Sequence, residues 1–242
     1  MLEAFGLSDQ GCVRANNEDY FIVDASAGIF VLADGMGGER AGECASRLSA
    51  EMIYHYLLEA PGSASHSDVC TIEHGFRTIN TVVCQAAEDN SELRGMGTTL
   101  VVARVVDDEN KLQIGSVGDS RAYLFSDGVL SLLTQDHTWI DEVGVPLGLT
   151  DDELRHHPMK HVLTMAIGTS QELRVHLSVT PMRVGDQVLL CSDGLHGVVQ
   201  AETLETILKG ELPAQEKCRL LVETAKCHGG PDNVTVVLIN RL

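Results

Sequence analysis

Short apolar runs with the pattern of β-strands constrain the fold of this chain more than any other feature. They cover residues 20–23, 29–33, 98–106, 112–117, 122–125, 129–133, 175–179, 188–191 and 234–239. Gly, Asp or Asn bounds most of them, as is usual at strand ends. Several runs are almost entirely apolar, which is typical of strands that are covered on both faces. The sequence therefore predicts β-sheets buried within a layered structure.

Helical periodicity is confined to a few blocks of the sequence. Apolar residues recur at helical spacing at Ala45, Leu48, Met52 and Tyr56, again at Phe76, Ile79, Val83 and Ala87, and in shorter form within 204–208 and 218–225. Helices and strands are segregated along the chain instead of alternating, which favours antiparallel sheets packed together with helices outside. With no long linker and no internal repeat, we expect one domain over residues 1–242.

The charge and the cysteines exclude several classes of protein. The 242 residues include 35 Asp and Glu against 17 Lys and Arg, a net charge of −18, which argues against binding DNA, RNA or anionic lipid. The seven cysteines are scattered and contain no C-x-x-C pair, which fits a reducing compartment better than disulfides or zinc. No leader and no run of ~20 apolar residues is visible. We therefore expect a cytoplasmic protein with no nucleic-acid or membrane partner.

Common nucleophile motifs are missing from the sequence. There is no G-x-x-x-x-G-K-[ST] loop, no H-E-x-x-H helix, no G-x-S-x-G elbow and no cysteine followed six residues later by arginine. Nucleophilic catalysis by a side chain thus has no visible candidate. The remaining candidates are carboxylates.

Four aspartates lie at the ends of apolar runs, next to Gly, Ser or Asn: Asp34, Asp119, Asp193 and Asp232. A strand end places a carboxylate on a rigid element, and hard ions such as Mg²⁺ prefer oxygen ligands of this kind. The alternative is that Asp-Gly simply forms a turn. The tripeptide at 126–128 is identical to that at 192–194, yet it lies between two apolar runs and predicts a hairpin at Asp127. A single Asp-Gly therefore carries almost no functional information.

A set of motifs, taken in order, is more informative. They are Arg14-x-Asn16-Asn17-Glu18-Asp19, Asp34-Gly35-Met36-Gly37-Gly38, Gly95-Met96-Gly97-Thr98-Thr99, Gly118-Asp119-Ser120-Arg121, Leu133-Thr134-x-Asp136-His137, Ser192-Asp193-Gly194 and Asp232-Asn233. In this order they resemble the bacterial form of the PP2C (PPM) family of metal-dependent serine/threonine protein phosphatases. The resemblance implies an α+β fold: a four-layer αββα sandwich of two antiparallel sheets flanked by helices, with a flap at about 136–169 beside the active site.

The resemblance also implies a metal centre of two Mn²⁺ or Mg²⁺ ions and a weaker third. The implied ligands are Asp34, which would bridge the two core ions, Asp193 and Asp232 for the first, the Gly35 carbonyl for the second, and Asp119 with Asp193 for the third. Glu18 would lie near the second ion and act on it directly or through a water. A water or hydroxide bridging the core ions would attack the phosphorus of phosphoserine or phosphothreonine. Asp34, Arg14 and Asp193 would be the catalytic residues.

Arg14 is expected to bind the substrate phosphate, because a guanidinium matches two phosphate oxygens. A salt bridge to Glu18 or Asp19 is the alternative, and both roles are compatible. Met36 stands where some family members have a histidine proposed as general acid, so we assign no general acid and expect Met36 to pack at the rim. We expect His156 and His157 to be solvated and Cys191 to be a buried strand thiol.

The resemblance implies phosphoserine and phosphothreonine proteins as partners, and a monomer that reverses a Hanks-type kinase, with type VI secretion components among the candidate substrates. Two alternatives stay open at this point. One is a phosphatase dedicated to a partner-switching protein of the anti-sigma-antagonist type. The other is a non-catalytic module that binds phosphoproteins.

Overall fold

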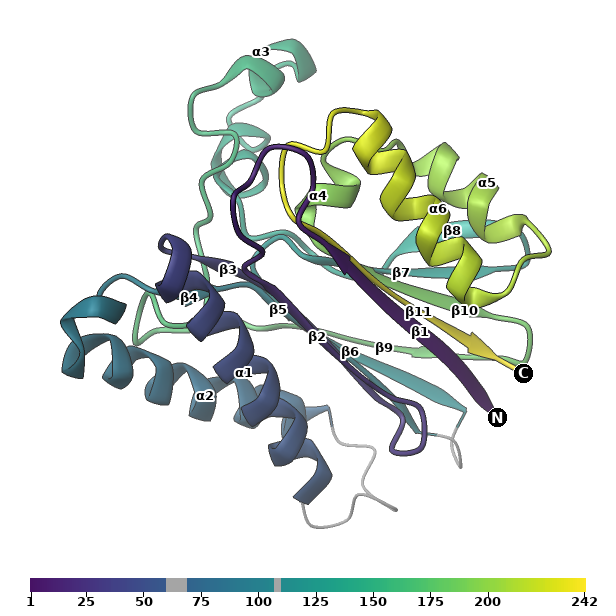
Figure 1. The fold of residues 1–242 in the computed structure, drawn as a ribbon, viewed down its shortest axis with the longest axis horizontal. Coiled ribbons are helices and arrows are strands. Elements are labelled where there is room, and N and C mark those ends of the chain that lie inside the picture. The colour runs from purple at the N-terminus through teal and green to yellow at the C-terminus, as the bar shows by residue number, and fades with distance from the viewer. Residues whose placement is uncertain (60–68, 107–109) are drawn as a thin grey trace.

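The computed structural model describes residues 1–59, 69–106 and 110–242, and these form two antiparallel sheets (Figure 1). The first sheet has the order β1 (Leu2–Asp9), β11 (Val234–Arg241), β10 (Gln187–Cys191), β7 (Arg121–Ser126) and β8 (Val129–Leu132). The second has the order β2 (Asp19–Asp24), β3 (Ile29–Met36), β5 (Leu100–Val106), β6 (Lys111–Val117) and β9 (His176–Pro181), and β4 (Gly97–Thr98) pairs with β3. Each strand predicted from the apolar runs is present.

Helices cover the outer face of each sheet. Helices α1 (Glu39–Glu59) and α2 (Cys70–Asp89) pack on the second sheet, followed by the short 3-10 helix η1 (Ser91–Leu93). Helices α5 (Ala201–Lys209) and α6 (Ala214–Cys227) pack on the first sheet, and the short α4 (Asp193–His196) follows β10 directly. The predicted four-layer αββα sandwich is confirmed.

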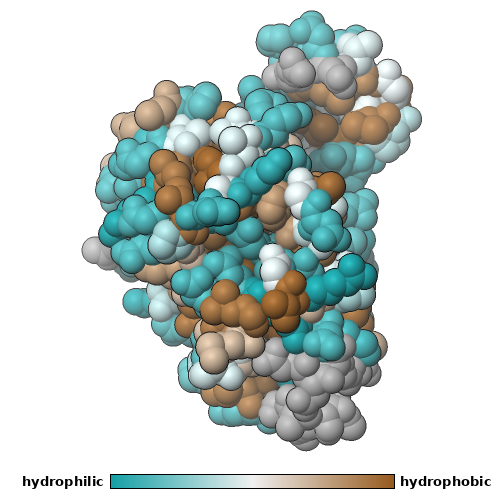
Figure 2. Space-filling view, turned by 90° about the vertical axis from the view of Figure 1, so that its right-hand side faces the viewer, coloured by the Kyte–Doolittle hydropathy of each residue, from teal (hydrophilic) through white to brown (hydrophobic). Residues whose placement is uncertain are grey.

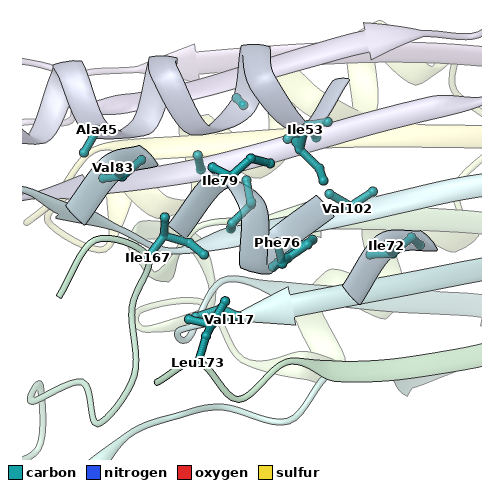
Figure 3. Packing of buried hydrophobic residues seen from close by; sticks show 14 of the residues in the cluster. Ala45, Ile53, Ile72, Phe76, Ile79, Val83, Val102, Val117, Ile167 and Leu173 are labelled. Carbon is teal, nitrogen blue, oxygen red and sulfur yellow. The ribbon is translucent and has the colours of Figure 1, made fainter. Parts of the chain in front are cut away.

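Three apolar clusters fill the spaces between the layers. The middle cluster joins the two sheets and includes Phe30, Leu112 and Val188. Figure 3 shows the cluster beneath α1 and α2, where Ile53 and Phe76 point toward the sheet. Burial of such side chains contributes roughly 25 cal/mol per Å² of apolar surface removed from water. Each sheet is therefore packed against helices on one face and against the other sheet on the opposite face, which fixes the positions of its strand ends.

Strand β1 is an element that the apolar pattern did not reveal. Residues Leu2–Asp9 pair antiparallel with β11 along their whole length, although the segment lacks clean alternation. Gly6 breaks the apolar pattern of the segment, and a glycine is needed there because a Cβ would lie 2.2 Å from the ring of Phe21. The strand is fixed by tertiary packing between the sheets, which local sequence does not report.

The hairpin predicted at 126–128 is confirmed. Ser126 pairs with Val129 across a two-residue turn in which Asp127 and Gly128 have φ of 52° and 83°. Positive φ at both positions is the signature of the type I′ hairpin turn. Asp127 is thus a turn residue, unlike Asp193 in the identical tripeptide.

The flap contains a single π-helical turn, η3 (Ile140–Gly144), and the short helix α3 (Asp151–His156). Isolated bridges join Thr138 to Leu163 at its base and Ile167 to Thr98 in the sandwich. Figure 2 shows the flap as a lobe at the top of the molecule with hydrophobic side chains on its surface. Its exposed apolar residues are Val145, Leu147, Met159 and Val162. Among the described helices, none combines the length and the apolar character that crossing a membrane requires.

Candidate metal centre

The predicted acidic residues gather where strands of both sheets end. Asp34 lies near the end of β3 and is in register with Asp19 of β2. Asp119 follows β6, Asp193 is the first residue of α4 after β10, and Asp232 lies just before β11. The two-sheet packing therefore brings together acids that are more than two hundred positions apart in the sequence.

The pKa values show how strongly these carboxylates crowd one another. Burial, followed by the charges of Asp19 and Asp193, raises the pKa of Asp34 well above its usual range. Burial also raises the pKa of Asp19 to about 7. At Asp119, burial together with the charge of Asp193 raises the pKa to about 7. Like charges this close to one another need cations or protons for compensation.

Unsatisfied oxygens point to the same requirement. Among the described residues, no three His, Cys, Asp or Glu side chains form a ready-made metal-binding group. However, Asp19 Oδ1 and Asp193 Oδ1 are buried and accept no hydrogen bond, although Ser192 Oγ donates to Asp19 Oδ2 at 2.9 Å. Buried orphan carboxylate oxygens are costly unless an ion or water satisfies them. The donor set therefore fits hard divalent ions, which prefer carboxylate and carbonyl oxygens.

Asp193 lies at the centre of this cluster. Burial and the charge of Asp232 raise its pKa, while a hydrogen bond with Asp34 and the charges of His161 and Arg14 act in the opposite direction. His161 belongs to the flap, so a flap side chain lies close enough to the acid cluster to affect the pKa of Asp193. Of the flap histidines, sequence gave no reason to single out this one.

Glu18 and Gly35 meet at a close approach between β3 and α1. The N–H of Gly35 donates to the Glu18 carbonyl at 3.2 Å. A Cβ on Gly42, in the first turn of α1, would lie 1.8 Å from Glu18 Oε2, and a Cβ on Gly35 would lie 2.2 Å from the Gly42 carbonyl oxygen. Gly42 thus provides the space in which the Glu18 carboxylate lies. Sequence reasoning missed this glycine, since nothing in the pattern links positions 18 and 42.

We predict that Gly42→Ala displaces the Glu18 carboxylate and weakens the second core ion. A contact of 1.8 Å cannot persist, so Glu18 or the start of α1 must move. Because changes beside metal ligands typically cost about 10-fold to 100-fold in metal affinity or activity, we expect a loss of that size in Mn²⁺-dependent turnover. Gly38→Ala is not a matched control because its φ is 84°. Glu43→Ala, at the exposed position next to Gly42 in the same helix, serves instead and should change turnover little.

Arg14 binds one of the predicted metal ligands. Its Nη2 lies 2.6 Å from Asp232 Oδ2, and this hydrogen bond is the main cause that raises the pKa of Arg14. The sequence suggested Glu18 or Asp19 as the partner of Arg14 in a salt bridge, whereas this ion pair is formed with Asp232. More than half of the Arg14 side chain remains exposed, at 56%. The guanidinium therefore lies beside the acid cluster with donors still open to solvent.

The loop before β2 is held against Asp232 by Asn233. Asn233 Nδ2 donates to the carbonyls of Gln10 and Asn16 at 3.0 and 2.8 Å, and Asn233 Oδ1 accepts from the Glu18 N–H at 2.9 Å. Sequence identified the Asp232-Asn233 pair without giving the asparagine a role. Its partners are more than two hundred positions away, so only the fold reveals that Asn233 positions both Arg14 and Glu18.

Lesser expectations have mixed outcomes. Cys191 is fully buried in β10, and burial raises the pKa of its thiol to about 12, as a structural cysteine requires. Met36 pairs with Gly97 and packs against it, which agrees with a packing role. His156 is exposed, as expected, and His157 is half-exposed, with one face of its ring stacked on Trp139 at a centroid separation of 4.1 Å.

Comparison with known proteins agrees with this geometry. A family profile described as Protein phosphatase 2C matches residues 13–224. The serine/threonine phosphatase stp of Listeria monocytogenes is 34% identical over 238 residues, covering 97% of this chain and 94% of that protein.

Solved structures give the same result. The PstP catalytic domain in complex with two manganese ions is 37% identical and superposes with a TM-score of 0.83, covering 99% of this chain and 97% of that one. PppA of Pseudomonas aeruginosa, described as a key regulatory component of T6SS, is 30% identical with a TM-score of 0.84 and covers 100% of this chain and 98% of that one. With a matching profile, full-length relatives and a shared fold, this chain belongs to the protein phosphatase 2C family.

Proposed function

We propose that residues 1–242 form one phosphatase domain that hydrolyses phosphoserine and phosphothreonine in proteins, with Mn²⁺ or Mg²⁺ as cofactor. The observation that carries this proposal is the cluster of partly buried, mutually repelling carboxylates beside a half-exposed arginine. Relatives that are serine/threonine phosphatases, and a solved neighbour with two manganese ions, support it.

Each group has a role in this proposal. Asp34, Asp193 and Asp232 hold the first core ion, Asp34 with the Gly35 carbonyl and Glu18 hold the second, and Asp119 with Asp193 hold a weaker third. When bound, the ions supply positive charge for the phosphate and make water more acidic. Arg14, anchored on Asp232, orients the substrate phosphate through its solvent-exposed N–H groups. Without cations the cluster would repel a phosphate dianion, so metal and substrate binding are linked.

The direct test is turnover of p-nitrophenyl phosphate and of a phosphothreonine peptide by the purified chain. We expect activity with Mn²⁺, complete loss with excess EDTA, and recovery when Mn²⁺ is restored. Binding of the phosphopeptide without turnover under all metal conditions would instead support the non-catalytic alternative. Turnover that survives EDTA would contradict the proposal.

Asp119→Ala separates the third ion from the core pair. The charge of Asp193 raises the pKa of Asp119, but Asp119 is not among the ligands proposed for the first two ions. We expect calorimetry to show loss of the weakest Mn²⁺ with the tighter ions retained, and turnover to fall by about 10-fold to 100-fold, the range for altered metal-site support. Loss of all Mn²⁺ binding would show that Asp119 supports the whole centre.

The cellular setting is proposed on narrower grounds. All seven cysteines are free thiols, which supports a reducing, cytoplasmic location. The likeness to PppA, which is described as a regulatory component of T6SS, supports phosphoproteins of a type VI secretion system as substrates. We propose that a Hanks-type kinase phosphorylates them. Comparing the phosphoproteome of a strain that lacks this activity with its parent would identify them. Enrichment of a single partner-switching protein would favour the dedicated-phosphatase alternative.

A further inference from the structure

The loop that carries Asp119 is held by a histidine on each side. From the start of the flap, the His137 N–H donates to the Gly118 carbonyl at 2.9 Å, and His137 Nδ1 accepts from the Gly118 N–H at 3.2 Å. From α4, His196 Nε2 lies 2.9 Å from the Asp119 carbonyl oxygen. A carbonyl oxygen only accepts, so Nε2 of His196 carries the proton and donates.

The His196 imidazole is neutral under ordinary conditions. Burial, with a smaller contribution from the charge of Arg121, lowers its pKa to about 3. It therefore adds no positive charge that could replace an ion in the acid cluster. Its contribution to the site is a directed hydrogen bond.

Helix α4 connects this hydrogen bond to the metal centre. Asp193 is its first residue and His196 its last, and the Gly197 N–H closes the turn by donating to the Asp193 carbonyl at 2.7 Å. The same short element thus carries the Asp193 carboxylate and the donor that holds the Asp119 backbone. The hydrogen bond therefore links the backbone of Asp119 to the helix that carries Asp193.

The opposite side of the loop is fixed independently of His196. Ser120 Oγ and Thr99 Oγ1 are 2.7 Å apart, and Thr99 Oγ1 accepts from the Asp34 N–H at 3.0 Å. These bonds tie the loop to β3 and the core ligand Asp34. Loss of the His196 bond would therefore leave the loop tied to β3 and to His137.

We propose that His196 is a positioning residue that sets the separation of the Asp119 and Asp193 carboxylates and thereby the affinity for the weakest divalent ion. This inference rests on the proposed function of the site. It assigns to His196 no contact with substrate or ion.

A comparison of His196→Gln with His196→Asn tests the inference. The glutamine amide can place a donor near the position of Nε2, whereas the shorter asparagine cannot reach the Asp119 carbonyl. Because one neutral hydrogen bond corresponds to about a five-fold change in an equilibrium constant, we expect His196→Asn to weaken the weakest Mn²⁺ about five-fold in calorimetry. His196→Gln should bind like the parent. The tighter ions should be unchanged in both variants.

Kinetics give a second readout. The His196→Asn variant should lose kcat at limiting Mn²⁺ and recover it at excess Mn²⁺, with KM for the phosphopeptide unchanged. His156→Asn is the matched control, because this exposed flap imidazole has its hydrogen bond and its ion-pair contact with Asp152 of its own helix. It should leave every Mn²⁺ affinity as it was.

The possible failures are distinguishable. If both His196 variants bind Mn²⁺ like the parent, or both are weakened equally, the hydrogen bond does not position Asp119 and the inference is wrong. If the parent itself binds no Mn²⁺ and turns over no phosphopeptide, the proposed function fails instead. Metal-free melting temperatures monitor folding, and a His196→Gln variant that folds but loses the weakest ion would also overturn the inference.

Discussion

Replacement of Asp34 by asparagine is expected to abolish turnover while making the metal-free protein more stable. The carboxylate is buried against Asp19 and Asp193, and this crowding raises its pKa well above the usual range. An amide of the same shape removes the repulsion but cannot neutralise two divalent ions. Since a metal's stabilisation of transition-state charge is worth several kcal/mol, we expect turnover to fall by about 10³-fold or more. Steady-state kinetics with Mn²⁺ and melting in EDTA measure both effects.

The chain offers a matched control for this experiment. Asp193 and Asp127 occupy identical Ser-Asp-Gly tripeptides, but Asp127 lies in a hairpin turn with its side chain 89% exposed. Asparagine tolerates the positive φ of that turn, so Asp127→Asn should change neither turnover nor metal-free stability appreciably. Asp193→Asn should behave like Asp34→Asn. Turnover by Asp34→Asn within ten-fold of the parent, or a clear loss from Asp127→Asn, would contradict the assignment.

Sequence predicted the fold well because its signals are local. The apolar runs and helical spacings are short-range patterns, and the buried faces of both sheets follow from them. Strand β1 was missed because Gly6 makes room for Phe21 of β2 in the facing sheet, a contact that no local pattern encodes. The positions of the four aspartates at strand ends were also readable, since a strand end is itself a local feature.

The residues that position the site could not be predicted from the sequence, because their contacts are not local. Gly42 makes room for Glu18, Asn233 holds the loop around Arg14, and His196 holds the Asp119 carbonyl. Each of these contacts joins residues on different elements. The pairing of Arg14 with Asp232 instead of its sequence neighbours has the same origin, because the loop before β2 is packed against the start of β11. Local sequence indicates which side chains carry chemistry, and tertiary packing decides what they contact.

Stabilisation of the protein by Mn²⁺ should grow steeply with pH. Asp19 and Asp119 have pKa values of about 7 in the folded chain against 3.8 when unfolded. An acid with a raised folded pKa contributes stability that is fully present below its unfolded pKa and is lost as the pH rises through its folded pKa. Without metal, this loss of stability is spread from about pH 4 to pH 7.5, and its last part falls between pH 6.5 and pH 8, where the protein should still become less stable.

Other titrations lie outside that interval. Hydrogen bonds from Ser26, the Ala27 N–H and Tyr54 lower the pKa of Asp24 to about 2, so its contribution is lost only at acid pH. Burial lowers the pKa of His137 and His196 from 6.5, so the stability that they contribute is lost below that pH and not above it. The carboxylate cluster accordingly dominates the slope above pH 6.5.

Divalent ions reverse this slope because they bind the deprotonated carboxylates. An ion present at 100 times its Kd stabilises a fold by about 2.7 kcal/mol, which for a chain of this size raises Tm by about 5–10 °C per site. We expect an increase of that order at pH 8.0 and a clearly smaller one at pH 6.5. Thermal melts with EDTA or Mn²⁺ at the two pH values provide the measurement.

Asp19→Asn is the control that links the slope to the cluster. Its amide oxygen can still accept from Ser192 Oγ, but the titrating charge is gone. The metal-free protein should then lose less stability between the two pH values, while the shift in Tm on adding Mn²⁺ persists because Asp19 is not among the proposed ligands. A metal-free Tm that rises with pH, or a Mn²⁺ effect equal at both pH values, would mean that the buried acids are not the ion-binding groups.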